Sequence, residues 1–390
     1  SHISHSQFSH LTISTDPDVT MEMESTSEST ATAPADAATT AALTIYGQKL
    51  QPEETPEFLS TSQASLTEEL EKLPHEKKAG WFKAQEKCPD LVGEEHRLMF
   101  LRCELFNAEV GELMFAYLCC SILFYDLALL NFRYVIIDII IQPAALRICK
   151  YWNRRIELFG DNRAFKPIHI GGDGALSSSS THSSSSNSSE HDDNTANNQS
   201  DDEAMVQHTL KGLYLGFIRP TQTHDTGGRA IMFVDPSRLA GYNKNDNDER
   251  MGVARALWYV MHNVFEGNDM VQKLGMVVIA HPHHAKISFI DRKLMKMNLD
   301  SISGCLPIRM GGFHICQPPW FFGKIIFPIM KVVMPERMRK RVRSHSGSEE
   351  KVLENLKEFG LGREVLPSEI GGDVLLDTDA WMREMKSRGL

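Results

Sequence analysis

From residue 204 onward, short apolar runs alternate with segments of helical length, and no other feature of the sequence constrains the fold as much. RAIMFVD (229–235) and GMVVIA (275–280) are bounded by Gly, Pro and Asp, as buried strands are. RMGGFHICQ (309–317) and RVRSH (341–345) are two further runs of this kind. Because strands and helices alternate, the pattern predicts an α/β domain.

The segment 249–265, between the first two runs, is apolar around most of its circumference. A helix that is apolar over so wide an arc is either buried on two sides or faces a cavity. One stripe consists of Met251, Ala254, Trp258, Met261 and Phe265, and a second stripe beside it consists of Val253, Leu257, Val260 and Val264.

The rest of the chain divides by composition. Helical spacing of apolar residues in 66–109 and 143–165 predicts a small helical domain over 66–165. Residues 1–65 and the Ser-rich residues 166–203 have no sustained apolar period, so we expect a disordered tail and a flexible loop there. The second domain then covers 204–378, and 379–390 form a C-terminal tail.

An apolar run at 113–141 interrupts the helical domain. It is long enough to span a bilayer, but its charged residues Asp126, Arg133 and Asp138 would each cost roughly 2.5–3.5 kcal/mol near the bilayer centre. The piece Val110–Gln142 begins with a codon in GT and can end with CAG, as an intron read in frame does. We interpret it as a retained intron; a genuine insertion and a membrane anchor are the alternatives.

The segment from Pro318 to Met334 is apolar apart from two lysines, which lie on one helix face. A dense basic segment follows it. An apolar helix that leads into such a segment suits contact with an anionic lipid surface, and the alternative is a buried core helix with a solvated basic end. The cationic residues are Lys324, Lys331, Arg337, Arg339, Lys340, Arg341 and Arg343.

The order LPIRMGGFHICQPPWFFGKIIFPIMKVV, then LPSEIGG (366–372), resembles the C-terminal half of a CRAL-TRIO lipid-binding domain. GRAIMFVDPSRL resembles the first central strand of that family, and EEHRLMFLRCELFNAE resembles its small helical domain. The resemblance implies a mixed sheet with flanking helices that enclose a lipid cavity. It also implies that 309–317 form the cavity floor and that the helix after them is a gate.

The resemblance further implies one lipophilic molecule or phospholipid, bound in the cavity and transferred or presented at membranes. In the phosphatidylinositol-binding branch an acidic residue precedes Arg-Met-Gly, but this chain has Ile308 there, which puts that specificity in doubt. We expect the pocket to be lined by Trp258, Met261, Val278, Phe313 and Ile315, and the gate to consist of Trp320, Phe321, Phe322, Ile325 and Ile329.

No set of residues suggests catalysis. HPHH (281–284) lacks a carboxylate at a ligand-like offset, no GxSxG motif occurs, and Cys305 and Cys316 lie in apolar runs. We therefore expect no enzyme, no metal and no cofactor. The alternatives are a non-catalytic regulatory module with the same fold and, disfavoured by the missing nucleophile motif, a lipid hydrolase.

The bulk charge and the cysteines indicate the partners and the compartment. The net charge of −10 argues against nucleic acid, and seven scattered cysteines without a CxxC pair indicate a reducing compartment. We expect a cytoplasmic monomer that contacts anionic membranes transiently.

Overall fold

A computed structural model describes residues 45–48, 50–106, 144–171, 193–328 and 336–389. The piece Val110–Gln142, interpreted above as a retained intron, lies outside these residues. So do Ile329 and Lys331, and the side chain of Arg337 is likewise not described.

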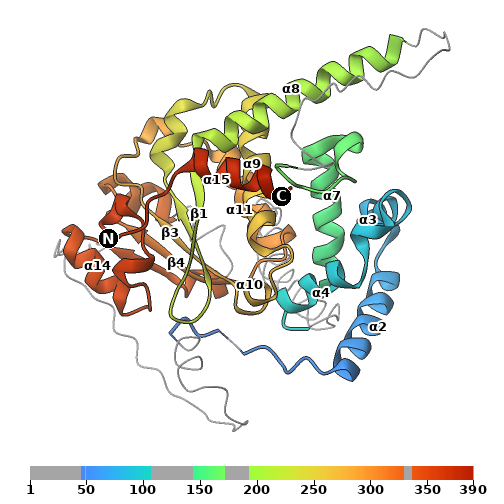
Figure 1. Ribbon diagram of the computed structural model, residues 1–390, viewed down its shortest axis with the longest axis horizontal. Helices are drawn as coiled ribbons and strands as arrows, with labels where there is room; N and C mark the ends of the chain where they lie inside the picture. Colours follow the sequence, from blue (N-terminus) through green and yellow to red (C-terminus); the bar gives the residue numbers. More distant parts are fainter. Residues whose placement is uncertain (1–44, 49, 107–143, 172–192, 329–335, 390) are drawn as a thin grey trace, which may run out of the picture. The chain divides into compact units, whose positions relative to one another are not determined.

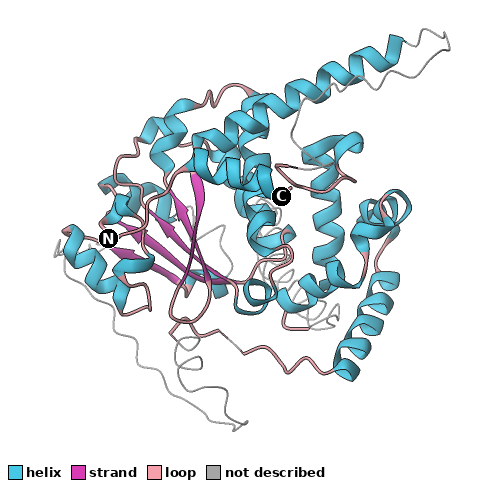
Figure 2. Ribbon diagram, in the orientation of Figure 1, coloured by secondary structure: helices cyan, strands magenta, loops and turns pink. Residues whose placement is uncertain are grey.

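Five strands form one mixed sheet in the order β1-β2-β3-β4-β5 (Figure 2). β1 pairs with β2 antiparallel, and the other neighbours are parallel. The four predicted runs are all strands, whereas the first strand was not predicted, because its sequence IRPTQTH is polar and it lies at the sheet edge. The strands are β1 (Ile218–His224), β2 (Ala230–Val234), β3 (Met276–Ala280), β4 (Met310–Cys316) and β5 (Val342–His345).

One face of the sheet is covered by helices that follow its strands. α9 (Asn247–Phe265) is capped by Asp246, whose side chain accepts hydrogen bonds from the backbone N–H groups of Asp248 and Glu249. Its two apolar stripes are buried except for Met251 and Val264, which are half-buried. α8 (Asp193–Leu215) packs along α9 (Figure 1). Gly252 allows this close approach, since a Cβ atom there would lie 2.3 Å from the His208 carbonyl oxygen. α10 (Asp269–Leu274) precedes β3, and α11 (Arg292–Asp300) continues into a π-helical turn, Ser301–Cys305.

The opposite face packs against the C-terminal part and a short N-terminal segment. α14 (Glu349–Lys357) is capped by Ser348, and it buries Val352 and Leu356 against the sheet. Tyr46 lies in the same apolar cluster, and its hydroxyl group is 2.7 Å from His314 Nε2 on β4. Tyr46, which precedes the helical domain, is therefore bound to this face of the sheet.

Four helices form the N-terminal part. They are α2 (Pro56–Lys72), α3 (His75–Lys87), α4 (Glu94–Cys103) and α7 (Ala144–Arg163). α7 connects this part to the second domain, because Tyr151 donates or accepts a 2.8 Å hydrogen bond with His262 of α9.

The structure differs from the predicted boundaries in three places. α2 begins at Pro56 rather than after residue 65, because Thr55 caps it. α8 occupies 193–215, where we expected a flexible loop to 203, and its later turns bury Val206 and Leu213. The predicted C-terminal tail contains α15 (Thr378–Arg388), which buries Met382 and Met385. Among the described helices, none is long and apolar enough to cross a bilayer.

Candidate functional site

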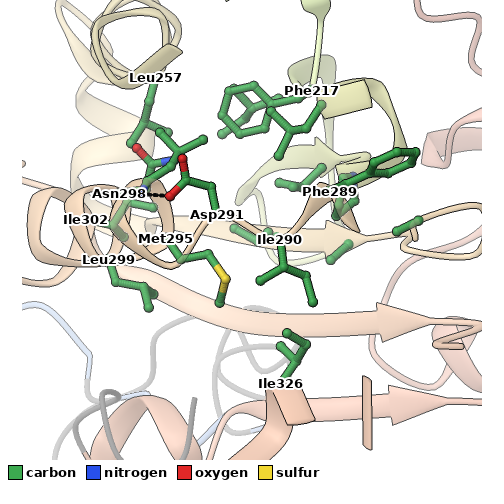
Figure 3. Close-up of a pocket in the computed structure, with 18 of the residues that line it drawn as sticks. Phe217, Leu257, Phe289, Ile290, Asp291, Met295, Asn298, Leu299, Ile302 and Ile326 are labelled. Atoms are coloured by element: carbon green, nitrogen blue, oxygen red, sulfur yellow. Dashed lines mark hydrogen bonds between the residues drawn. The ribbon is translucent and has the colours of Figure 1, made fainter. Parts of the chain in front are cut away.

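An apolar cavity of about 210 Å³ lies on the α9 face of the sheet. Its floor is formed by side chains of four strands, and among them Val278 of β3 is the register partner of Phe313 of β4. Leu257 and Met261, one turn apart on α9, form a wall, and α11 with the turn after it forms another (Figure 3). The α11 side is lined by Leu294, Met295, Leu299 and Ile302.

The gate segment covers this cavity through a stripe of apolar side chains. The central turn is a π-helix, Phe322–Ile326, in which the N–H of Phe327 donates to the carbonyl oxygen of Phe322. π-Helical turns of this kind are frequent at functional sites. Phe321, Phe322 and Ile326 line the cavity, and Phe321 and Ile326 are buried.

Two predicted gate residues do not line the cavity. Trp320 is 74% exposed, and the Lys324 ammonium lies 6.0 Å from the centre of its ring. Ile325 is half-buried and packs against the cluster of Ile315, Phe321 and Ile326. Trp320 is therefore directed to solvent, whereas Ile325 packs behind the side chains that line the cavity.

Three of the five predicted pocket residues line the cavity, namely Met261, Val278 and Phe313. Trp258 does not, because its ring is directed toward α7 and its Nε1 donates to Ser301 Oγ at 3.1 Å. Ile315 does not either. It lies on the same sheet face as Phe313, but Phe321 and Ile326 pack over it.

One end of the cavity has a buried ionic cluster that was not predicted from the sequence. Asp291 caps α11, accepts a hydrogen bond from Tyr242, and pairs with Arg250 of α9 at 2.8 Å. Burial raises the pKa of the Asp291 carboxyl, but the hydrogen bonds from Tyr242 and Arg250 outweigh burial, so its pKa lies below the usual value. The carboxylate is thus charged and fully partnered, and it ties α11 to α9.

The histidines and cysteines singled out in the sequence do not form a reactive site. His281 is buried and lies 3.0 Å from Gln317 Oε1, while His283 and His284 are exposed. Within the described ranges, no three His, Cys, Asp or Glu side chains are placed to hold a metal ion. Burial raises the pKa of the Cys316 thiol to about 12 and also raises that of Cys305, so these thiols stay protonated at neutral pH.

The side chains of the basic segment after the gate differ in exposure and in their contacts with the backbone. Arg339 and Lys340 are exposed. Arg341 donates to the carbonyl oxygen of Met310, and Arg343 donates to that of Lys340 at 2.7 Å. The guanidinium groups of Arg341 and Arg343 are therefore engaged with the backbone.

Residues 217–372 match the family model of the CRAL/TRIO domain, which supports the resemblance drawn from the sequence. The structure has the mixed sheet and the preceding helices that the resemblance predicts. Domains of this family bind lipophilic ligands in general. No curated protein is significantly similar to the chain. Among solved structures, "Crystal structure of Sfh5" matches with 13% identity and a TM-score of 0.28, over 38% of this chain and 60% of that chain.

Proposed function

We propose that the domain binds one lipophilic molecule in the cavity beneath the gate segment and exchanges it with membranes. The observation that carries the proposal is the lining, which is almost entirely hydrocarbon and lies on a domain of a lipid-binding family. Each buried CH₂ group of a ligand contributes about 0.8 kcal/mol, so a chain of moderate length binds without any charged contact.

Exchange requires an opening, and the gate is the segment best suited to provide it. Phe321 and Phe322 close the cavity from a helix whose central turn is π-helical. Two large apolar side chains beside the cavity remain exposed, Trp320 at 74% and Ile287 at 52%. A tryptophan exposed to this extent suits the bilayer interface, where an amphipathic ring is stabilised.

Binding to an anionic membrane would be assisted by the basic segment. Each cationic side chain near such a surface contributes about 1 kcal/mol, and the attraction decays over roughly 8 Å at physiological salt. The net charge of −10 therefore does not prevent local docking. We assign docking to the basic segment predicted from the sequence, in which Arg339 and Lys340 are exposed.

The test distinguishes ligand binding in the cavity from contact with the membrane. The organic extract of the purified protein is analysed by mass spectrometry, and uptake of diphenylhexatriene is titrated without vesicles. Phe322→Asp should abolish uptake, because it places a carboxylate in the lining. Trp320→Asp, on the same segment but outside the lining, should take up the probe as wild type does and transfer it between vesicles more slowly.

The outcomes distinguish the alternatives. Stoichiometric lipid and loss of uptake only in Phe322→Asp support the carrier. No lipid in the extract and no uptake by wild type would instead favour a regulatory module. Docking is tested with phosphatidylserine vesicles: binding should fall steeply with salt and be lost when Arg337, Arg339 and Lys340 are changed together to Glu.

A further inference from the structure

Asn298 contributes the one buried polar atom of the cavity lining that has no hydrogen-bond partner among the described residues. Besides apolar side chains, the lining contains Lys286, Asp291 and Asn298. Lys286 is exposed, and Asp291 is occupied by Tyr242, Arg250 and the backbone at the start of α11. The Oδ1 atom of Asn298 is buried and has no hydrogen-bond partner among the described residues.

The position of Asn298 directs it to the cavity. It lies seven residues after Asp291, two helical turns along α11, so both residues are on the same helix face. Figure 3 shows Asp291 and Asn298 on one side of the pocket, with Leu257, Met295 and Ile302 near them. A buried amide oxygen that accepts no hydrogen bond is destabilising, so Oδ1 of Asn298 lowers the stability of the protein when the cavity is empty.

We propose that Asn298 determines specificity by binding a single uncharged oxygen of an otherwise hydrocarbon ligand. An amide both donates and accepts, and a hydroxyl group can donate to its oxygen while it accepts from its nitrogen. The inference rests on the proposed function and narrows it: the enclosed part of the ligand is a lipid alcohol or a similar neutral lipid with one polar group. Among the described lining residues the one cation is Lys286, which is exposed, so a charged headgroup would meet no enclosed cation there.

The experiment compares two ligands that match in length, nonane and octanol. Each displaces diphenylhexatriene from the full protein, and the ratio of their dissociation constants is measured in wild type and in Asn298→Leu. The difference in hydration between the two ligands is the same for both proteins, so it cancels in the comparison. Loss of the hydrogen bond in Asn298→Leu should raise the dissociation constant of octanol relative to that of nonane by about three- to tenfold.

Asn263→Leu is the matched control. Asn263 is also half-buried with an unpartnered Oδ1, but it lies on α9 outside the cavity lining, so its replacement should leave the ratio unchanged. If Asn298→Leu does not fold by circular dichroism, Asn298→Ala replaces it. An equal ratio in wild type and the Asn298 variant overturns this inference and leaves the carrier standing; failure of wild type to bind nonane or octanol overturns both.

Discussion

Replacing Gly312 with alanine should release Tyr46 from the back of the sheet and lower the free energy of unfolding by about 2–4 kcal/mol. Gly312 lies on β4, directly under the Tyr46 ring. A Cβ atom at this position would lie 2.3 Å from Cε1 of that ring, 2.8 Å from Cζ and 2.9 Å from Cδ1. Ordinary carbon contacts are about 3.5–4.0 Å, so the ring has to move by roughly 1 Å.

The expected loss in the free energy of unfolding is the sum of the contacts that the movement of the Tyr46 ring disturbs. Overpacking of a core costs about 1–3 kcal/mol. The Tyr46 hydroxyl group is 2.7 Å from His314 Nε2, and loss of this hydrogen bond adds about 1 kcal/mol. The Arg229 guanidinium, 4.4 Å from the ring centre, also loses a contact.

Urea unfolding of four proteins tests the reasoning: wild type, Gly312→Ala, Tyr46→Ala and the double variant. In the Tyr46→Ala background the added methyl group has room, so its cost should fall below about 1 kcal/mol. Gly323→Ala is the control, since a Cβ atom there meets nothing within 4 Å, and its stability should equal wild type. An equal cost of Gly312→Ala with and without the Tyr46 ring would refute the assignment.

Three further perturbations have defined outcomes. Burial lowers the pKa of His345 to about 4 and holds that of His314 well below its usual value, so the unfolded state binds the protons first. Thermal stability should therefore be constant above about pH 7 and fall as the pH drops from about 6.5 toward 4. Trp258→Phe removes the hydrogen bond to Ser301 and should cost about 1–3 kcal/mol while diphenylhexatriene affinity stays the same. Deletion of 110–142 should leave a folded protein. Sequencing of the transcript tests the intron hypothesis, which is rejected if every mature message encodes residues 110–142.

The strands of the sheet interior could be predicted because a parallel strand buried on both faces is a continuous apolar run. β1 has the opposite character. Its Arg219, Thr221 and Gln222 suit an edge strand whose pairing with β2 comes from the fold and not from apolar content. The gate was predictable as an apolar segment, but its π-helical turn was not, since hydrophobic content does not distinguish π from α geometry.

The face of α9 that meets the cavity could not be identified from its two apolar stripes. The cavity wall takes one residue from each stripe, Leu257 and Met261, so it lies along the boundary between them. Trp258, beside both, is turned toward α7 and Ser301. The wide arc indicated burial on two sides or a cavity, and the structure has both.

The roles of the polar residues in the site could not be predicted from the sequence, because they depend on partners from other helices. Asp291, the N-cap of α11, and Asn298 are two turns apart on one face of the helix, and nothing in DRKLMKMNLD (291–300) separates their roles. Asp291 is neutralised by Arg250, which α9 supplies from 41 positions earlier in the chain. No comparable partner reaches Asn298 within the described residues, so its amide is left for a ligand. The same helix therefore holds one polar group that stabilises the fold and one that selects what the cavity binds.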